Sequence, residues 1–178
     1  MASIFDRIIT YGGHATCEST LMGATFASMH FYNMIADVDI DNGAPMLLKP
    51  ENYQESDLFK AEVPAITDKI VLALTAPKIY QEFMERDQEE ANFFNGKGEA
   101  IRAYEVFETD RFTLDALGFD DDATPEVGKY VVVNGTDYKF TTVDDEPAAN
   151  TYGFVGYIYT MSNNGKYRIF VKRNRAVE

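Results

Sequence analysis

Few residues of this chain could carry out nucleophilic chemistry. They are one cysteine, Cys17, and two histidines, His14 and His30. A catalytic thiol needs a base within hydrogen-bond reach and a third group that orients the base. His14 lies three residues before Cys17 in a glycine-containing segment, and neither residue sits in a local motif of a thiol enzyme. The pattern favours a small buried thiol, so we predict no catalytic residue.

The sequence offers equally little for a metal ion. A structural zinc site needs four nitrogen or sulfur ligands, and one cysteine with two histidines cannot supply them. The acidic run 37–43 resembles a calcium loop, but loop positions 6 and 12 hold Asn42 and Leu48 instead of glycine and glutamate. We interpret this run, and those at Asp120–Asp122 and Asp144–Glu146, as solvated loop charge. No metal and no cofactor are therefore predicted.

The charge of the chain limits its partners. The 178 residues carry a formal net charge of −13, and a surface this acidic repels phosphate backbones and anionic lipid. We expect no nucleic acid and no membrane as partner. The C-terminal end is the exception, because a predicted hairpin there carries the cations Lys172, Arg173 and Arg175. These cations either contact a protein partner or balance the acidic body within the chain.

The elements that must position these residues have the signature of a β domain. Length predicts one domain, and 46% hydrophobic residues suffice for one sizeable core. Short apolar or alternating runs separated by Gly, Asn and Pro predict strands within 57–63, 69–74, 99–107, 111–114, 128–133, 138–143, 154–161 and 167–171. Asn134-Gly135 predicts the turn of a hairpin between 128–133 and 138–143. One short polar helix is expected at 78–92. The fold class is all-β, a small barrel or a sandwich.

The first 36 residues carry only three charged side chains and many interruptions by Gly, Ser and Thr. One interpretation is a segment that covers the core of its own domain. The other is an extended arm, residues 1–36, in front of a β domain, residues 37–178. An arm would bury adaptable Met and aromatic side chains against a neighbouring subunit, and its predicted anchors are Met22, Phe26, Met29, Phe31 and Tyr32.

The order of segments resembles the decoration, or cement, proteins of tailed bacteriophage heads. A low-complexity N-terminal segment leads into Asp39-Ile40-Asp41-Asn42-Gly43, then Phe59-Lys60-Ala61-Glu62-Val63-Pro64 and a strand like Lys69–Leu74. Asn92-Phe93-Phe94, Glu99–Phe107 and Asp110–Leu114 follow in the same order. The resemblance implies a non-enzymatic virion protein that binds the outer head surface. Its implied partners are the major capsid protein and neighbouring copies of itself, as a monomer or a homotrimer.

Three alternatives remain open at this point. The chain could be a tail or neck component of the virion. It could be a hydrolase centred on Cys17 and His14, or a ligand-binding β-sandwich that uses the aromatic residues Tyr152, Phe154, Tyr157 and Tyr159. No secretion signal and no apolar run of membrane-spanning length are recognised, so assembly in a host cytoplasm is expected. If residues 1–36 form an arm, their deletion leaves a folded domain that no longer binds heads.

Overall fold

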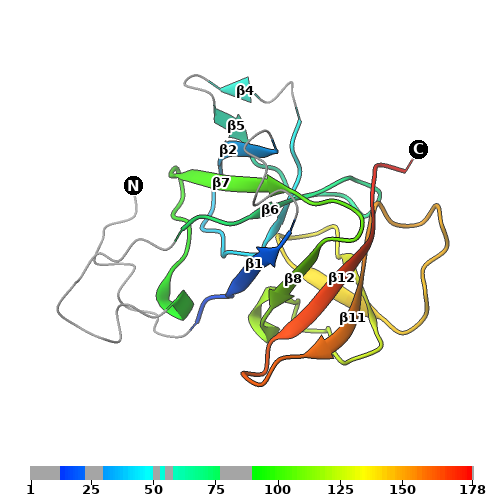
Figure 1. Cartoon of the computed structure of the whole chain (residues 1–178). Coiled ribbons are helices and arrows are strands. Elements are labelled where there is room, and N and C mark those ends of the chain that lie inside the picture. The colour runs from blue at the N-terminus through cyan, green and yellow to red at the C-terminus, as the bar shows by residue number, and fades with distance from the viewer. Residues whose placement is uncertain (1–12, 23–29, 50–52, 55–57, 77–89, 178) are drawn as a thin grey trace.

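Two six-stranded β-sheets form the body of the molecule (Figure 1). The computed structural model describes residues 13–22, 30–49, 53–54, 58–76 and 90–177. The first sheet contains, in spatial order, β1 (Cys17–Leu21), β8 (Arg111–Leu114), β12 (Tyr167–Asn174), β11 (Phe154–Met161), β9 (Tyr130–Val133) and β10 (Phe140–Val143). The second sheet contains β3 (Pro45–Met46), β6 (Val71–Ala73), β7 (Ala100–Glu105), β2 (Phe31–Ile35), β5 (Leu58–Lys60) and β4 (Tyr53–Gln54). The predicted all-β class is confirmed.

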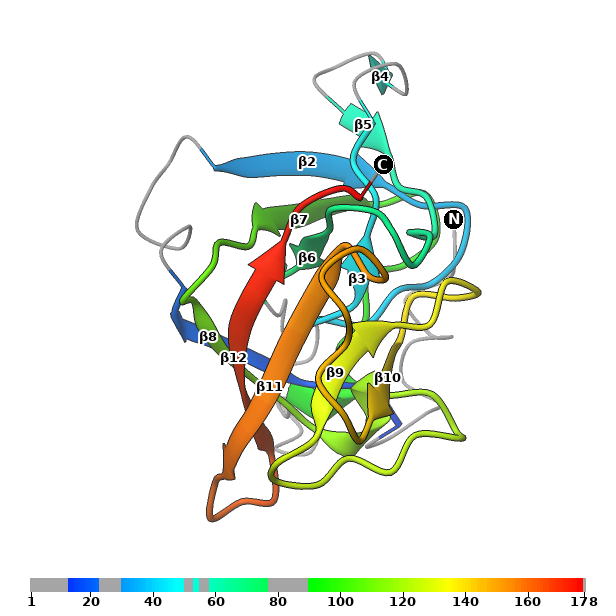
Figure 2. The same cartoon turned by 90° about the vertical axis from the view of Figure 1, so that its right-hand side faces the viewer.

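The first sheet is antiparallel throughout and curls into a half-barrel. Figure 2 shows β12, β11, β9 and β10 side by side, with β8 and β1 passing behind them. At the edge of this sheet, Phe119 forms an isolated parallel bridge with Phe140 of β10, the last strand. In the second sheet, β2 and β5 are the one parallel neighbouring pair. The architecture therefore combines features of the two all-β alternatives, a sandwich of sheets in which one sheet closes halfway into a barrel.

Helical structure is minor in the described part of the chain. It consists of two 3-10 turns, η5 (Glu90–Asn92) and η6 (Ala116–Gly118). The polar helix predicted at 78–92 lies mostly outside the described residues. Asp115 caps η6 by accepting a hydrogen bond from Leu117 N at 3.1 Å.

The main core lies inside the half-barrel. Alternation along the strands points Phe112, Phe140 and Phe154 inward, where their rings pack with centroid separations of 5.3 to 6.5 Å. Leu72 of β6 joins the same cluster, together with Ile70 just before β6 and Val106 just after β7. The two sheets are therefore joined by one shared apolar core.

A second core covers the other face of the second sheet. Val71 and Ala73 point into it while Leu72, between them, points into the main core. All three residues of β6 are buried because both faces of this sheet are covered. This explains why Lys69–Leu74 reads in the sequence as a continuous apolar run instead of an alternating one.

The described parts of residues 1–36 are built into both sheets. β1 pairs with β8 of the first sheet, and β2 pairs with β5 and β7 of the second. The side chain of Met22 is fully buried in the main core. The prediction of Met22 as a partner anchor is therefore wrong, because its apolar surface is already covered by its own domain. The interpretation of this segment as a cover of its own core fits these residues, and removing 1–36 would take one strand from each sheet.

Two turns of the chain depend on asparagine or glycine. β9 and β10 form the predicted antiparallel hairpin, in which Asn134-Gly135 begins a six-residue connection because Val133 pairs with Phe140. The side chain of Asn134 organises this loop by accepting hydrogen bonds from Thr136 N and Asp137 N. At Gly43 the backbone has φ +87°, and an added Cβ would lie 2.6 Å from the side chain of Leu114. Glycine is required there by both conformation and space.

Candidate functional site

The structure gives each histidine a carboxylate as its hydrogen-bond partner. His14 Nδ1 donates to Asp41 Oδ1 at 2.8 Å, and the imidazole stacks on Phe94 with ring centroids 4.7 Å apart. His30 Nδ1 donates to Glu105 Oε2 at 3.0 Å, on the second sheet. Each imidazole is thus held by a carboxylate, and no hydrogen bond between Cys17 and either of them is present among the described residues.

The thiol of Cys17 is held in its protonated form. Burial raises the pKa of this thiol well above its usual range, and the nearby charge of Lys166 offsets only part of that effect. Asp115 adds to the rise because a second negative charge nearby disfavours the thiolate. Since the thiolate is the nucleophile, this environment is the opposite of the one that activates a catalytic cysteine.

The carboxylates of the 37–43 run point to different protein groups. Asp37 forms an ion pair with Lys60 Nζ at 2.7 Å, and this hydrogen bond lowers the pKa of Asp37. Asp39 accepts from Lys97 N at 2.7 Å, and Asp41 accepts from His14 and from Ala15 N. The carboxylates therefore tie loops together. Within the ranges that the structure describes, no group of three or more such side chains is arranged to hold a metal ion.

The other predicted anchors have different surroundings. Phe31 and Tyr32 lie half-buried on β2. The guanidinium of Arg102 sits 4.3 Å from the centroid of the Phe31 ring, and Tyr32 packs edge-on against Phe59. Both side chains thus have partners within the second sheet and keep part of their surface exposed. Phe26 and Met29 lie outside the described residues.

The basic C-terminal hairpin is partly neutralised within the molecule. Lys172 forms an ion pair with Glu146, and this hydrogen bond raises the pKa of Lys172 above its usual range. A nitrogen of Arg173 donates to the carbonyl of Ala148 at 3.3 Å. Arg175 is exposed. Of the three predicted contact residues, Lys172 thus fits the alternative of internal charge balance, while Arg175 keeps its side chain available.

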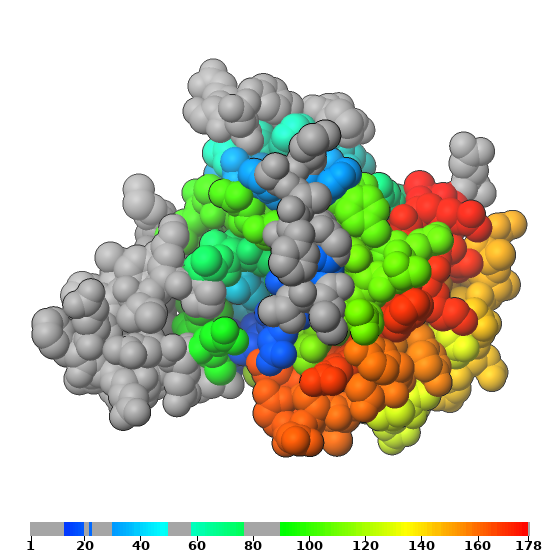
Figure 3. Space-filling model, in the orientation of Figure 1, coloured from blue at the N-terminus to red at the C-terminus, as the bar shows by residue number. Residues whose placement is uncertain are grey.

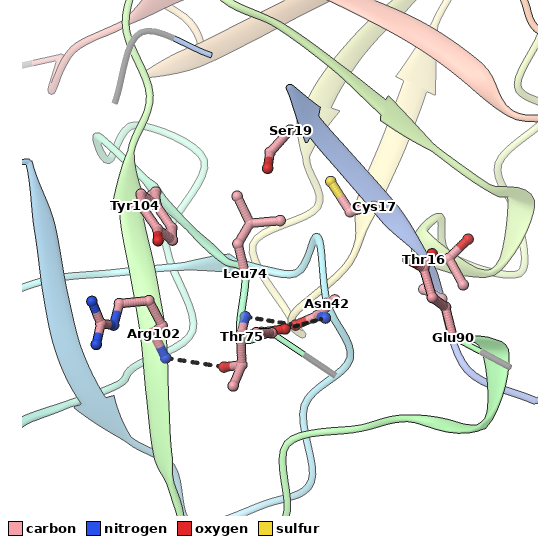
Figure 4. Close-up of a pocket in the computed structure, with 11 residues that line it drawn as sticks. Thr16, Cys17, Ser19, Asn42, Leu74, Thr75, Glu90, Arg102 and Tyr104 are labelled. Atoms are coloured by element: carbon pink, nitrogen blue, oxygen red, sulfur yellow. Dashed lines mark hydrogen bonds between the residues drawn. The ribbon is translucent and has the colours of Figure 1, made fainter. Parts of the chain in front are cut away.

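A cleft of about 700 Å³ opens between the two sheets (Figure 4). Thr16 and the β1 residues Cys17 and Ser19 line one wall, and Arg102 and Tyr104 of β7 line the other. Between them Asn42 accepts from Thr75 N and donates to Thr75 O, which pins the floor of the cleft. The lining includes the hydroxyl side chains of Thr16 and Ser19 and the carboxylate of Glu90, so the cleft can hold polar groups.

Sequence reasoning missed this cleft, because its walls come from segments about 85 residues apart in the chain. The signal that existed was the residue types: two hydroxyl side chains beside Cys17, and Asn42 at a turn. Nothing in their spacing indicated that β1 would face β7.

Comparisons with known proteins identify no relative: no family model, curated protein or solved structure matches the chain. In the described part of the chain, no helix has the length and apolar character needed to cross a membrane.

Proposed function

We propose that this chain is a capsid decoration protein of a tailed bacteriophage. It binds the outer surface of the head through protein contacts and bridges neighbouring major capsid subunits. The observation that carries the proposal is the order of the segments from Asp39 to Leu114 and their resemblance to that family.

The surroundings of Cys17 and the two histidines support a role in protein binding more than a role in catalysis. The Cys17 thiol is kept neutral by burial, and both histidines hydrogen-bond to carboxylates instead of to this thiol. Nucleophilic catalysis requires the reverse arrangement, with a base beside an activated nucleophile. The hydrolase alternative therefore has less support than a binding role.

The charge and architecture support the same role. A net charge of −13 keeps a free subunit soluble before assembly. Two sheets joined by one core form a rigid body, so contacts made from it lose little conformational entropy. Repeating a weak contact over a large shell multiplies its effect by avidity.

The contact residues for this role are now fewer than the sequence predicted. Met22 is excluded by burial, whereas Phe31 and Tyr32 retain exposed surface on β2. At the C-terminal end Arg175 is exposed, and it is the cation of the hairpin that we assign to the head surface.

The test is co-sedimentation of the purified full-length chain with undecorated heads of the phage that encodes it. Binding should saturate at a stoichiometry that matches the repeating capsomers of the shell. Arg175→Glu should weaken binding, while Lys97→Glu, a charge reversal at another exposed cation, should not.

The runner-up function is that of a tail or neck component. Such a protein would bind only at the unique vertex, in a few copies per particle. Absence of binding to the shell would contradict the decoration proposal.

A further inference from the structure

A row of aromatic side chains crosses the face of the first sheet that points away from the core. Phe170 of β12 pairs with Arg111 of β8 on one side and with Tyr157 of β11 on the other. Tyr157 in turn pairs with Tyr130 of β9, and the two rings lie 5.2 Å apart. The strand neighbours of these residues are core residues, so alternation directs this row outward.

Part of this row forms a groove of about 630 Å³, lined by Thr109, Arg111, Tyr157, Tyr159 and Phe170 and called here the aromatic groove. Figure 3 shows the orange and red atoms of β11 and β12 at the surface, on the right of the molecule. Thr109 at its rim has φ 77°, an unfavourable conformation for a β-branched residue. Strained backbone of this kind is concentrated at functional sites.

The composition of the groove fits a protein partner. Tyrosine and arginine are the residue types that dominate binding energy at protein interfaces. Thr109, Arg111 and the tyrosine hydroxyl groups can form hydrogen bonds across such an interface. A protein surface that presents apolar side chains next to carboxylates fits this lining.

The charge around the groove selects an acidic partner. Arg111 and Arg168 are exposed and lie on adjacent strands, and neither forms an ion pair with any described residue. Glu146, which reaches the same sheet face, is already paired with Lys172. The groove is therefore a cationic surface on a chain whose net charge is −13.

The chain itself carries a surface complementary to the groove. In the acidic loop, residues 120–124, Asp121 and Asp122 are exposed and make no ion pair with any described residue. Leu117, four residues before Asp121, is 42% exposed. Hydrogen bonds from Asp120 N to Phe140 O and from Thr124 N to Thr142 Oγ1 hold this loop along β10.

We propose that the aromatic groove of one copy binds the acidic loop of a second copy. The groove lies over β8, β12 and β11, whereas the loop lies at β10, the last strand at one end of the same sheet. One copy can therefore use both surfaces at once, which gives a head-to-tail contact that can close into a ring. The proposal does not depend on binding to phage heads, because it concerns the purified chain.

The test is sedimentation velocity of the full-length chain over a range of concentrations. The wild-type chain should self-associate at low salt and dissociate at about 1 M salt, where charges are screened within about 3 Å. The double variant Arg111→Glu with Arg168→Glu should weaken association at least about tenfold. Asp121→Lys with Asp122→Lys should weaken it equally, and a mixture of the two double variants should associate again because each supplies what the other lacks.

The matched control is Lys60→Glu with Lys97→Glu, two exposed cations, which changes the net charge as much but lies outside the groove. It should leave self-association unchanged, and thermal melts should show that all variants remain folded. A wild-type chain that stays monomeric, or a groove variant that associates as tightly as the control, would overturn the proposal. A monomeric chain that binds a glycan array through Tyr157 would assign the groove to carbohydrate instead. Head binding that survives while self-association is lost would leave the proposed function intact.

Discussion

At the scale of single residues, Asn174 links the two sheets through three hydrogen bonds. From the end of β12, its side chain accepts from Ile70 N at 2.9 Å and donates to the carbonyls of Ile70 and Val106 at 2.9 and 2.7 Å. All these groups are buried, and a buried polar group left without a partner costs about 1–3 kcal/mol. The amide of Asn174 thus satisfies backbone groups that the β-ladders leave open.

We expect Asn174→Ala to lower the free energy of unfolding by about 3 kcal/mol, because three buried backbone groups lose their hydrogen-bond partner. In a domain of this size that corresponds to a fall in Tm of about 6–12 °C. Calorimetry of the variant and of Asn163→Ala, a change at an exposed loop position, would measure it. Equal melting temperatures for the two variants would show that the amide bridge contributes little.

The second prediction at this scale concerns Cys17. Because burial raises the pKa of its thiol, very little thiolate is present in the native state at about pH 8. An aromatic disulfide reagent should react with the native chain more than about tenfold more slowly than with the chain unfolded in guanidinium. Equal rates in the two states would contradict the assigned environment and reopen the thiol-enzyme alternative.

At the scale of elements, β1 and the residue that follows it are part of the main core. Met22→Ala should therefore destabilise the fold by about 3 kcal/mol, in the range of other large-to-small core substitutions. Met161 is 52% exposed, so Met161→Ala should change the free energy of unfolding by less than about 0.5 kcal/mol. Urea unfolding of both variants makes the comparison. If the two methionines proved equally dispensable, the segment would be an arm after all.

Glu105 ties together three segments of the second sheet. Burial raises the pKa of its carboxyl, but hydrogen bonds from Lys69 and His30 outweigh this effect and leave the pKa below its usual value of 4.5. The ionised carboxylate therefore stabilises the fold above about pH 4.5, and this contribution is lost as the pH falls through the lowered pKa.

The corresponding variant is Glu105→Gln, which keeps the shape and removes the charge. At about pH 7 it should be less stable than the wild type by about 2 kcal/mol, and the difference should shrink below about pH 4.5. Glu108→Gln, at an exposed position, is the control. A stability difference that stays constant between about pH 7 and pH 3 would mean that the carboxylate charge is not what stabilises this junction.

Strands could be predicted from the sequence where apolar residues alternate or run continuously between turn residues. The segment Arg111–Leu114 was predicted as a strand with the bounds that β8 has, because its apolar residues alternate and turn residues flank it. The continuous apolar run before Pro77 also became a strand. The hairpin at Asn134-Gly135 was predicted as well, and the Asn134 side chain stabilises its six-residue connection through local hydrogen bonds.

At the scale of the whole molecule, the sequence could not predict which strands are neighbours. β1 pairs with β8 across almost one hundred residues, and this pairing is what buries Met22 and forms a wall of the cleft. The aromatic groove has the same origin, since Arg111, Phe170 and Tyr157 come together only through sheet order. Contacts of this kind depend on long-range packing, and no local period encodes them.

The proposed function also belongs to this scale, because a decoration protein acts through many copies on one shell. The most direct measurement is electron cryo-microscopy of undecorated heads after incubation with the full-length chain. The account predicts regular added density on the outer surface at the repeating capsomer positions, into which the two-sheet domain fits. Bare capsomers, or density confined to the tail vertex, would contradict it.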